Sequence, residues 1–370
     1  MKNSTKILLI VAACLILLGC ALAAGAAAFT PGGFPALMRK MEASSCTIGW
    51  TASGLGDWEN TYSPDNHYNV EENLSSLDID WTAGTVTLVL YDGDQILFEE
   101  QSENPLDADN ALRYGIKNET LYIQYCKKGP AFNLPKKDLT VYIPRADTFR
   151  SIELDTASAA AYAENLICES FAADTASGNL KLVNISAEKL RFSSSSGKLD
   201  GDGIFQDIKA NSTSGGLRLT LSKEALRCVC STTSGKIHVS GSFREFSAES
   251  TSGDIDAQIH AEQADFDTIS GKLTISGEID DLEAESVSGQ VEFTASGNAP
   301  QTLDISTTSG DVALTLPENA SFTLDFDTVS GNFDSDIAIS LQKNRYVCGN
   351  GSGNYEIETV SGSLRIYDLQ

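Results

Sequence analysis

Histidine and basic residues are scarce in this sequence. Its 370 residues include three histidines, and 26 lysines and arginines stand against 51 aspartates and glutamates, for a formal net charge of −25. A surface of this sign repels nucleic acid, so nucleic-acid binding is excluded as a function. The three histidines, His67, His238 and His260, are isolated from one another, and a zinc site of cysteine and histidine is therefore poorly supported.

Sequence motifs for catalysis are also missing. The chain has no zincin motif, phosphate-binding loop or nucleophile elbow, and it lacks the calcium-binding nonapeptide of secreted β-rolls. We interpret "DGD" at Asp92–Asp94 as a hairpin turn rather than a pair of ligands. The sequence thus predicts no enzyme, no catalytic residue and no cofactor-binding residue. A carbohydrate-active β-helix enzyme is the alternative, because parallel β-helices can carry a basic group and acidic metal ligands in one groove.

The long hydrophobic run of the chain lies at its N-terminus. "ILLIVAACLILLGCALAAGAAAF", residues 7–29, contains no charge and as a helix would be roughly 34 Å long, enough to cross a membrane. Lysines precede it, which predicts a cytoplasmic tail at 1–6, a single transmembrane anchor at 7–29 and an extracellular C-terminal domain at the plasma membrane. The alternative is a lipoprotein processed at Cys20 of "LLGC". Residues 30–73, with breaks such as "TPGGFP", are predicted to form an extracellular stalk.

From residue 74 onward the sequence is typical of successive strands, and from Ser177 a Ser-Gly phrase repeats, as in "AESTSGDIDA" (248–257), "FDTISGKLTI" (266–275) and "AESVSGQVEF" (284–293). Between Ser177 and Ser330 the copies follow every 18–21 residues, and a further copy stands at Ser361. In each copy the residues six and four before the serine and three after it are mostly apolar, and the residue two before it carries a hydroxyl. Side chains two apart on a strand share a face, so these positions form stacked columns along an inner wall.

This pattern predicts an all-β fold: a single-stranded parallel β-solenoid of residues 74–370, with 18–21-residue coils and Ser-Gly corners. We expect the corner glycine to adopt positive φ. Cys168, Cys228 and Cys230 fall in apolar columns and are expected to pack as small buried residues. An antiparallel meander with Ser-Gly hairpins is the alternative, although it gives no reason for the columns to persist.

Both ends of the repeat are irregular. "LDIDWTAGTVTLVL" (77–90) has the cadence of a coil, and with "TLYIQYC" (120–126) and "LTVYIP" (139–144) it is expected to cap the stack. The interval between Ser330 and Ser361 is too long for one coil and contains "QKNRYVCGNGSGN", which we expect to form a loop or bulge.

Acidic residues recur five and three positions before the serine, and stacking of the coils would align them in a stripe. Like charges one rung apart destabilise each other, so either solvent screens them or a cation bridges them. The stripe is therefore a candidate site for calcium or a cationic peptide, with a solvated face that prevents aggregation as the alternative. Its predicted members are Asp265, Asp267, Glu283, Glu285, Asp304, Asp325, Asp327, Glu356 and Glu358.

The order of these elements resembles a known bacterial family. A hydrophobic span, an "LDIDWTAGTVTLVLYDGDQILFEE" opening (77–100), an "LTVYIP" strand and Ser-Gly repeats to the C-terminus are similar to a domain of unknown function often labelled "putative adhesin". The resemblance implies a β-solenoid on the surface of Gram-positive bacteria, linked in some members with envelope stress. It implies cell-wall or host-surface ligands as partners, and it supplies no catalytic residue.

Overall fold

The computed structural model describes residues 66–126, 135–145, 147–343 and 345–369. The predicted tail, the membrane span and all but the end of the predicted stalk lie outside these residues. Within them, no helix is long and apolar enough to cross a membrane. Every regular element of the described chain is a β-strand, which confirms the all-β prediction. The chain divides after Ser222 into two compact units, which we call the first unit (66–222) and the second unit (223–369).

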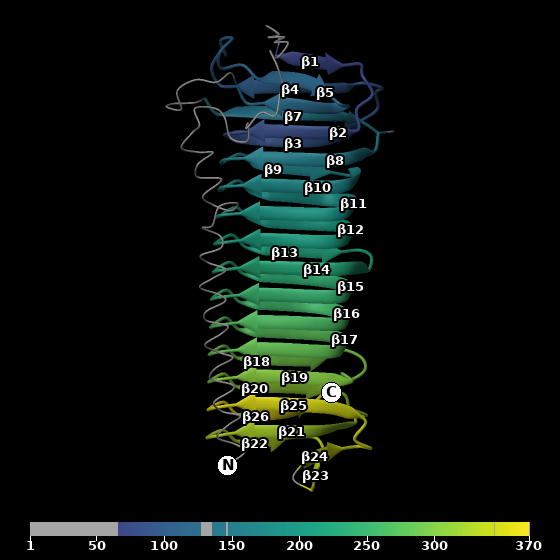
Figure 1. Ribbon diagram of the computed structural model, residues 1–370, viewed down its shortest axis with the longest axis vertical. Coiled ribbons are helices and arrows are strands. Elements are labelled where there is room, and N and C mark those ends of the chain that lie inside the picture. The colour runs from purple at the N-terminus through teal and green to yellow at the C-terminus, as the bar shows by residue number, and fades with distance from the viewer. Residues whose placement is uncertain (1–65, 127–134, 146, 344, 370) are drawn as a thin grey trace. The chain divides into compact units, whose positions relative to one another are not determined.

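The second unit is a stack of parallel coils (Figure 1). Its inner columns follow the sequence alignment: Phe246 pairs with Ala264, Ala264 with Leu282 and Leu282 with Leu303, and all four side chains are buried. Parallel register rules out the antiparallel meander. The strands are β14 (Ala225–Thr232), β15 (Ile237–Ser250), β16 (Ile255–Thr268), β17 (Leu273–Ser286), β18 (Val291–Ala295), β19 (Thr302–Thr307), β20 (Val312–Leu316), β21 (Phe322–Thr328), β22 (Phe333–Ser335), β23 (Ser340–Gln342), β24 (Arg345–Cys348), β25 (Gly353–Thr359) and β26 (Leu364–Asp368).

The first unit, taken by itself, has parallel pairing from β8 to β13, and its antiparallel pairs lie toward its N-terminus. Its strands are β1 (His67–Val70), β2 (Ser76–Trp81), β3 (Gly84–Tyr91), β4 (Ile96–Ser102), β5 (Arg113–Lys117), β6 (Thr120–Gln124), β7 (Lys137–Pro144), β8 (Phe149–Thr156), β9 (Ala160–Glu164), β10 (Ile167–Thr175), β11 (Leu180–Ser194), β12 (Leu199–Ser212) and β13 (Leu217–Leu221).

Two hydrogen bonds hold the Ser270-Gly271 corner. The N–H of Gly271 donates to Oγ1 of Thr268 at 3.0 Å, which explains the hydroxyl two positions before the serine. The hydroxyl of Ser270 donates to the carbonyl oxygen of Thr251 in the neighbouring coil at 3.3 Å. The same local N–H to hydroxyl bond recurs at Gly178, Gly197, Gly215, Gly235, Gly253, Gly289, Gly331 and Gly362.

The expected reason for the corner glycine was wrong. Positive φ occurs at other glycines, such as Gly277 at 144°, and not at Gly271. A Cβ atom on Gly271 would instead lie 2.1 Å from the carbonyl oxygen of Gly253 in the neighbouring coil. The glycines stack directly on one another, and the close approach of the two backbones excludes a side chain.

The order of the rungs differs from the order of the sequence at the C-terminus. β25 pairs with β19 on one side and β21 on the other, and β26 lies in the same way between β20 and β22 (Figure 1). The last coil is thus inserted between two earlier ones. The long interval before Ser361, expected as a loop or bulge, contains the β23–β24 hairpin, and β24 pairs antiparallel with the start of β21.

An equivalent insertion occurs in the first unit. β2 lies between β6 and β8, and β3 lies between β7 and β9, so the segment 77–90 forms an inner rung rather than a cap. The strands that cover β6 and β7 are antiparallel: β5 pairs with β6, β4 pairs with β7, and β1 pairs with β4. β3 and β4 both pair with β7, one on each side, so Asp92–Asp94 connects strands that are not partners and is no hairpin turn.

The cysteines behave mostly as apolar residues. Cys168, Cys228 and Cys230 are buried, as predicted, and the Sγ atoms of Cys228 and Cys230 lie 3.8 Å apart in the core. Burial raises the pKa of the Cys168 thiol to about 12, which leaves it unreactive at neutral pH. Cys126 is disulfide-bonded.

Candidate functional site

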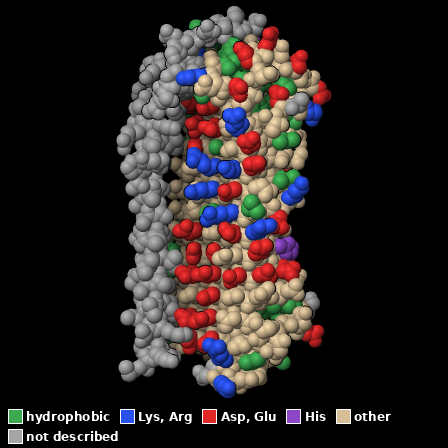
Figure 2. All heavy atoms as spheres, turned by 45° about the vertical axis from the view of Figure 1, so that its right-hand side comes forward, with side chains coloured by type: hydrophobic (Ala, Val, Ile, Leu, Met, Phe, Trp, Pro, Cys, Tyr) green, Lys and Arg blue, Asp and Glu red, His purple; other side chains and the backbone are tan. Residues whose placement is uncertain are grey.

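The second unit carries two columns of carboxylates on one outer face, which we call the acidic face. The first column pairs Asp265 with Glu283, Glu283 with Asp304, Asp304 with Glu356 and Glu356 with Asp325. Adjacent rungs lie about 4.8 Å apart. Figure 2 shows acidic side chains gathered in rows on one side of the molecule. The structure therefore brings the predicted residues of this column together.

The second column contains the remaining predicted members and one further acidic residue. Asp267 pairs with Glu285 on one side and Glu249 on the other, and Glu358 pairs with Asp327. The sequence prediction did not include Glu249, whose coil has Ser247 at the first-column position. Since β25 lies between β19 and β21, Glu356 and Glu358 stand in the middle of the face rather than at its end.

Burial, together with the crowding of like charges, raises pKa values on the acidic face. Partial burial, followed by the charges of Glu285 and Glu249, raises the pKa of Asp267 to about 7. Partial burial and then the charge of Glu356 raise the pKa of Asp304 to about 6. The pKa values of Asp265 and Glu285 are raised in the same sense, chiefly by burial. Burial and neighbouring carboxylates thus both favour the protonated form of these side chains.

Calcium needs a converging set of oxygen ligands, typically six to eight. Among the described residues, no group of three or more histidine, cysteine, aspartate or glutamate side chains is arranged so that it could hold a metal ion. At one end of the face a cation comes from the chain itself: Nη2 of Arg345 lies 3.6 Å from Oδ2 of Asp325. The columns offer rows of separate carboxylates rather than a coordination shell.

The raised pKa of Asp267 predicts that stability falls as the pH rises. An unfolded aspartate loses its proton near pH 4, whereas the folded protein holds it up to about pH 7, so the folded state binds more protons between these values. The free energy of unfolding should therefore decrease from about pH 4 to about pH 7 and level off above. Asp267→Asn should raise the melting temperature at pH 8 and flatten this dependence.

Thermal unfolding at pH 5 and pH 8 measures the effect. Glu262→Gln is the matched control, because it removes one charge from an exposed residue of β16 outside the two columns. If Asp267→Asn and Glu262→Gln change the melting temperature equally at pH 5 and equally at pH 8, the loss of stability at the higher pH does not come from the carboxylate column.

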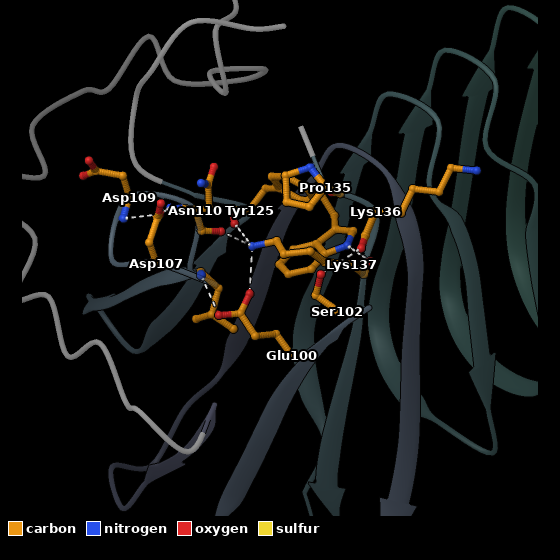
Figure 3. Close-up of polar contacts among 11 residues, drawn as sticks. Glu100, Ser102, Asp107, Asp109, Asn110, Tyr125, Pro135, Lys136 and Lys137 are labelled. Atoms are coloured by element: carbon orange, nitrogen blue, oxygen red, sulfur yellow. Dashed lines mark hydrogen bonds and ion pairs between the residues drawn. The ribbon is translucent and has the colours of Figure 1, made fainter. Parts of the chain in front are cut away.

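A buried ion pair in the first unit escaped the sequence analysis (Figure 3). Nζ of Lys137 lies 2.7 Å from Oε2 of Glu100, and both side chains are inaccessible to solvent. The ammonium also donates to the backbone carbonyl oxygens of Asn110, at 2.7 Å, and Tyr125. Oε1 of Glu100 accepts the backbone N–H of Leu112 at 2.8 Å.

Aromatic rings complete the enclosure of this pair. Nζ of Lys137 lies 4.9 Å from the ring centre of Trp81 and 4.2 Å from that of Tyr125. Burial lowers the pKa of Lys137 to about 8, and Glu100 opposes this shift, so the ammonium form persists at neutral pH. With all three N–H bonds directed at oxygen acceptors, Lys137 joins β4, β7 and the segments between them and is a structural residue.

The chain belongs to the Toastrack DUF4097 family, whose model matches residues 74–221 and 200–367. The two matched ranges together span the described solenoid, which confirms the resemblance seen in the sequence. No curated protein matches the chain.

Three solved structures are similar to the chain, each over 82% of its length. A "putative cell adhesion protein" from Clostridium sporogenes has 10% identity, 99% of its own chain covered and a TM-score of 0.18. A "putative lipid binding protein" from Parabacteroides distasonis has 16% identity, 96% coverage and a TM-score of 0.36. A "putative adhesin" from Bacteroides fragilis has 13% identity, 96% coverage and a TM-score of 0.26.

Proposed function

We propose that this protein is a non-catalytic, membrane-anchored surface protein of the adhesin type, whose solenoid binds cationic partners through the acidic face. The observation that carries the proposal is the pair of carboxylate columns, held at the spacing of the rungs by a rigid parallel ladder. Repulsion among neighbouring carboxylates contributes, after burial, to the raised pKa values of Asp267 and Asp304. A partner with several positive charges relieves that repulsion and gains affinity from it.

A polycation fits the face better than a bound calcium ion does. The carboxylates lie in rows, and no described group of three acidic, cysteine or histidine side chains converges as a metal site would require. A cationic peptide or a cell-wall or host-surface ligand with repeated amines can contact one rung after another along the first column. In the second column Ser306 separates Glu285 from Glu358. Its binding should weaken as salt is added, because the contacts lie at the protein surface, where dissolved ions screen them.

The test is the affinity of the purified protein for a fluorescent oligolysine, measured by anisotropy at low and physiological salt. We expect the variant with Asp265→Asn, Asp267→Asn, Glu283→Gln and Glu285→Gln to lose most of the affinity while melting at a higher temperature than the wild type. The matched control removes four exposed acids from the first unit instead: Glu169→Gln, Glu188→Gln, Asp200→Asn and Asp207→Asn.

Equal loss of affinity in both variants would show that net charge alone attracts the peptide, and the proposed face would be abandoned. Calcium is tested in parallel, at fixed ionic strength, by its effect on the melting temperature. A stoichiometric calcium ion on the acidic face would stabilise the folded state by mass action and raise the melting temperature. We expect calcium to cause no change in melting temperature that depends on Asp265, Asp267, Glu283 and Glu285.

The proposal places the chain at the plasma membrane, with the span at 7–29 as anchor and the solenoid outside the cell. Protease added to intact cells without their wall should then degrade the solenoid while cytoplasmic proteins survive. Full protection of the solenoid in intact cells, with degradation after lysis, would contradict the topology.

A further inference from the structure

The buried pair of the first unit brings together an amine and a carboxyl group, the two halves of an amide. Nζ of Lys137 lies 2.7 Å from Oε2 of Glu100, and neither side chain is accessible to solvent (Figure 3). In water these groups remain ammonium and carboxylate, because both ions are strongly hydrated. Burial removes that hydration, so the neutral amine and the neutral acid lie closer in free energy to the ion pair.

The hydrogen bonds of Lys137 orient its nitrogen toward the carboxyl group. Two of its N–H bonds are directed at the backbone carbonyl oxygens of Asn110, at 2.7 Å, and Tyr125. When the third proton passes to Oε2 of Glu100, the lone pair left on Nζ points at the carboxyl group. Burial assists this transfer, since it lowers the pKa of Lys137 to about 8.

The carboxyl group of Glu100 has a hydrogen-bond donor on its other oxygen. Oε1 accepts the backbone N–H of Leu112 at 2.8 Å. Attack of an amine on Cδ places negative charge on this oxygen, and the N–H of Leu112 is positioned to stabilise that charge, as the donors of an oxyanion hole do. The site thus holds a nucleophile, a carboxyl carbon and a donor for the developing oxyanion within one enclosure.

We propose that Lys137 and Glu100 condense in the folded protein to form an isopeptide bond. A bond forms between Nζ of Lys137 and Cδ of Glu100, and the bond between Cδ and Oε2 breaks. Oε2 leaves as water with two of the three ammonium protons, one transferred before the attack and one as the tetrahedral intermediate collapses. The product is a neutral secondary amide, and the reaction consumes no oxidant, reductant or other co-reactant.

The bond would join two strands that are already paired. β4 and β7 are antiparallel neighbours, and the two residues are 37 positions apart in the sequence. A cross-link of this span restricts the unfolded chain and holds the antiparallel strands of the first unit in place. The amide keeps a single N–H, so one of the two carbonyl oxygens loses its donor, and the released water can bond to it instead. The inference is independent of the acidic face.

Mass spectrometry of the full protein tests the proposal directly. After reduction of disulfides and unfolding, we expect the wild-type chain to be lighter than its sequence predicts by the mass of one water molecule. Trypsin does not cleave after an acylated lysine, so digestion should leave the bond between Lys137 and Asp138 intact. Further digestion and fragmentation should find the peptide that begins at Lys137 joined to the peptide that contains Glu100.

Two variants separate this bond from other losses of water. Lys137→Arg keeps the positive charge beside Glu100, but its protonated guanidinium is a poor nucleophile, so we expect the full sequence mass. Lys136→Met alters the exposed neighbour and should keep the loss of water. The wild-type result stands by itself if Lys137→Arg does not fold. A wild-type chain of full mass after prolonged incubation at neutral pH would overturn the proposal. A loss of water that persists in Lys137→Arg, or that fragmentation assigns to a cyclic imide at an aspartate, would overturn it as well.

Discussion

Lys137→Met should destabilise the protein by about 3–5 kcal/mol, the cost typical of removing one partner from a buried ion pair. The substitution leaves the carboxylate of Glu100 without its ammonium in a site closed to solvent. It also leaves the carbonyl oxygens of Asn110 and Tyr125 without the donor that Lys137 supplies. The free energy of unfolding from urea denaturation measures the effect.

The neighbouring residue provides the control, because Lys136 is exposed. Lys136→Met should change the free energy of unfolding by no more than a few tenths of a kcal/mol. Glu100→Gln should also destabilise strongly, since it leaves the buried ammonium unpaired. The double variant Lys137→Met, Glu100→Gln should lose less than the sum of the two single changes, because no buried charge remains. Strict additivity would show that the two groups do not act as a pair.

Gly271→Val should destabilise the stack by about 1–3 kcal/mol or more, as expected when extra atoms are forced into a closely packed position. The first added carbon would already lie 2.1 Å from the carbonyl oxygen of Gly253, and backbone atoms in a paired ladder have little freedom to move away. Even Gly271→Ala should therefore be costly, because the added methyl group meets the same oxygen. Thermal and urea unfolding give the measurement.

Lys272→Ala is the control for this corner. Nζ of Lys272 lies 2.7 Å from Oε2 of Glu292 in a pair that is partly exposed, and such a surface pair contributes at most about 1 kcal/mol. A melting temperature for Gly271→Ala equal to that of Lys272→Ala would show that the neighbouring glycines do not approach as closely as described.

The columns of the solenoid could be predicted because every coil must bury side chains at the same positions and form the same corner hydrogen bond. Inward positions such as Phe246, Ala264 and Leu282 must be apolar, and Thr268 must accept the N–H of Gly271. The order of the last rungs could not be predicted from the repeat. Strands β21 and β25 both satisfy the columns, so alternation alone does not decide which of them pairs with β19.

The acidic face could be predicted for the same reason, since residues in one column face outward together. Lys137 and Glu100 illustrate the opposite case. Lys137 stands in phase with the buried Leu139, and Glu100 with the buried Phe98, so both charges fall at inward positions of their strands. That phase was the available signal, but the pairing of β4 with β7 that brings them together depends on tertiary structure.

The central claim is that polycations bind along the two carboxylate columns, and zero-length cross-linking tests it most directly. A carbodiimide couples the amines of bound oligolysine to the carboxylates they touch, and mass spectrometry then locates the linked residues. We predict cross-links concentrated on Glu283, Asp304 and Glu356, which lie on adjacent rungs of the first column. Cross-links spread evenly over exposed acids such as Glu188 and Asp207, or concentrated there, would contradict the account.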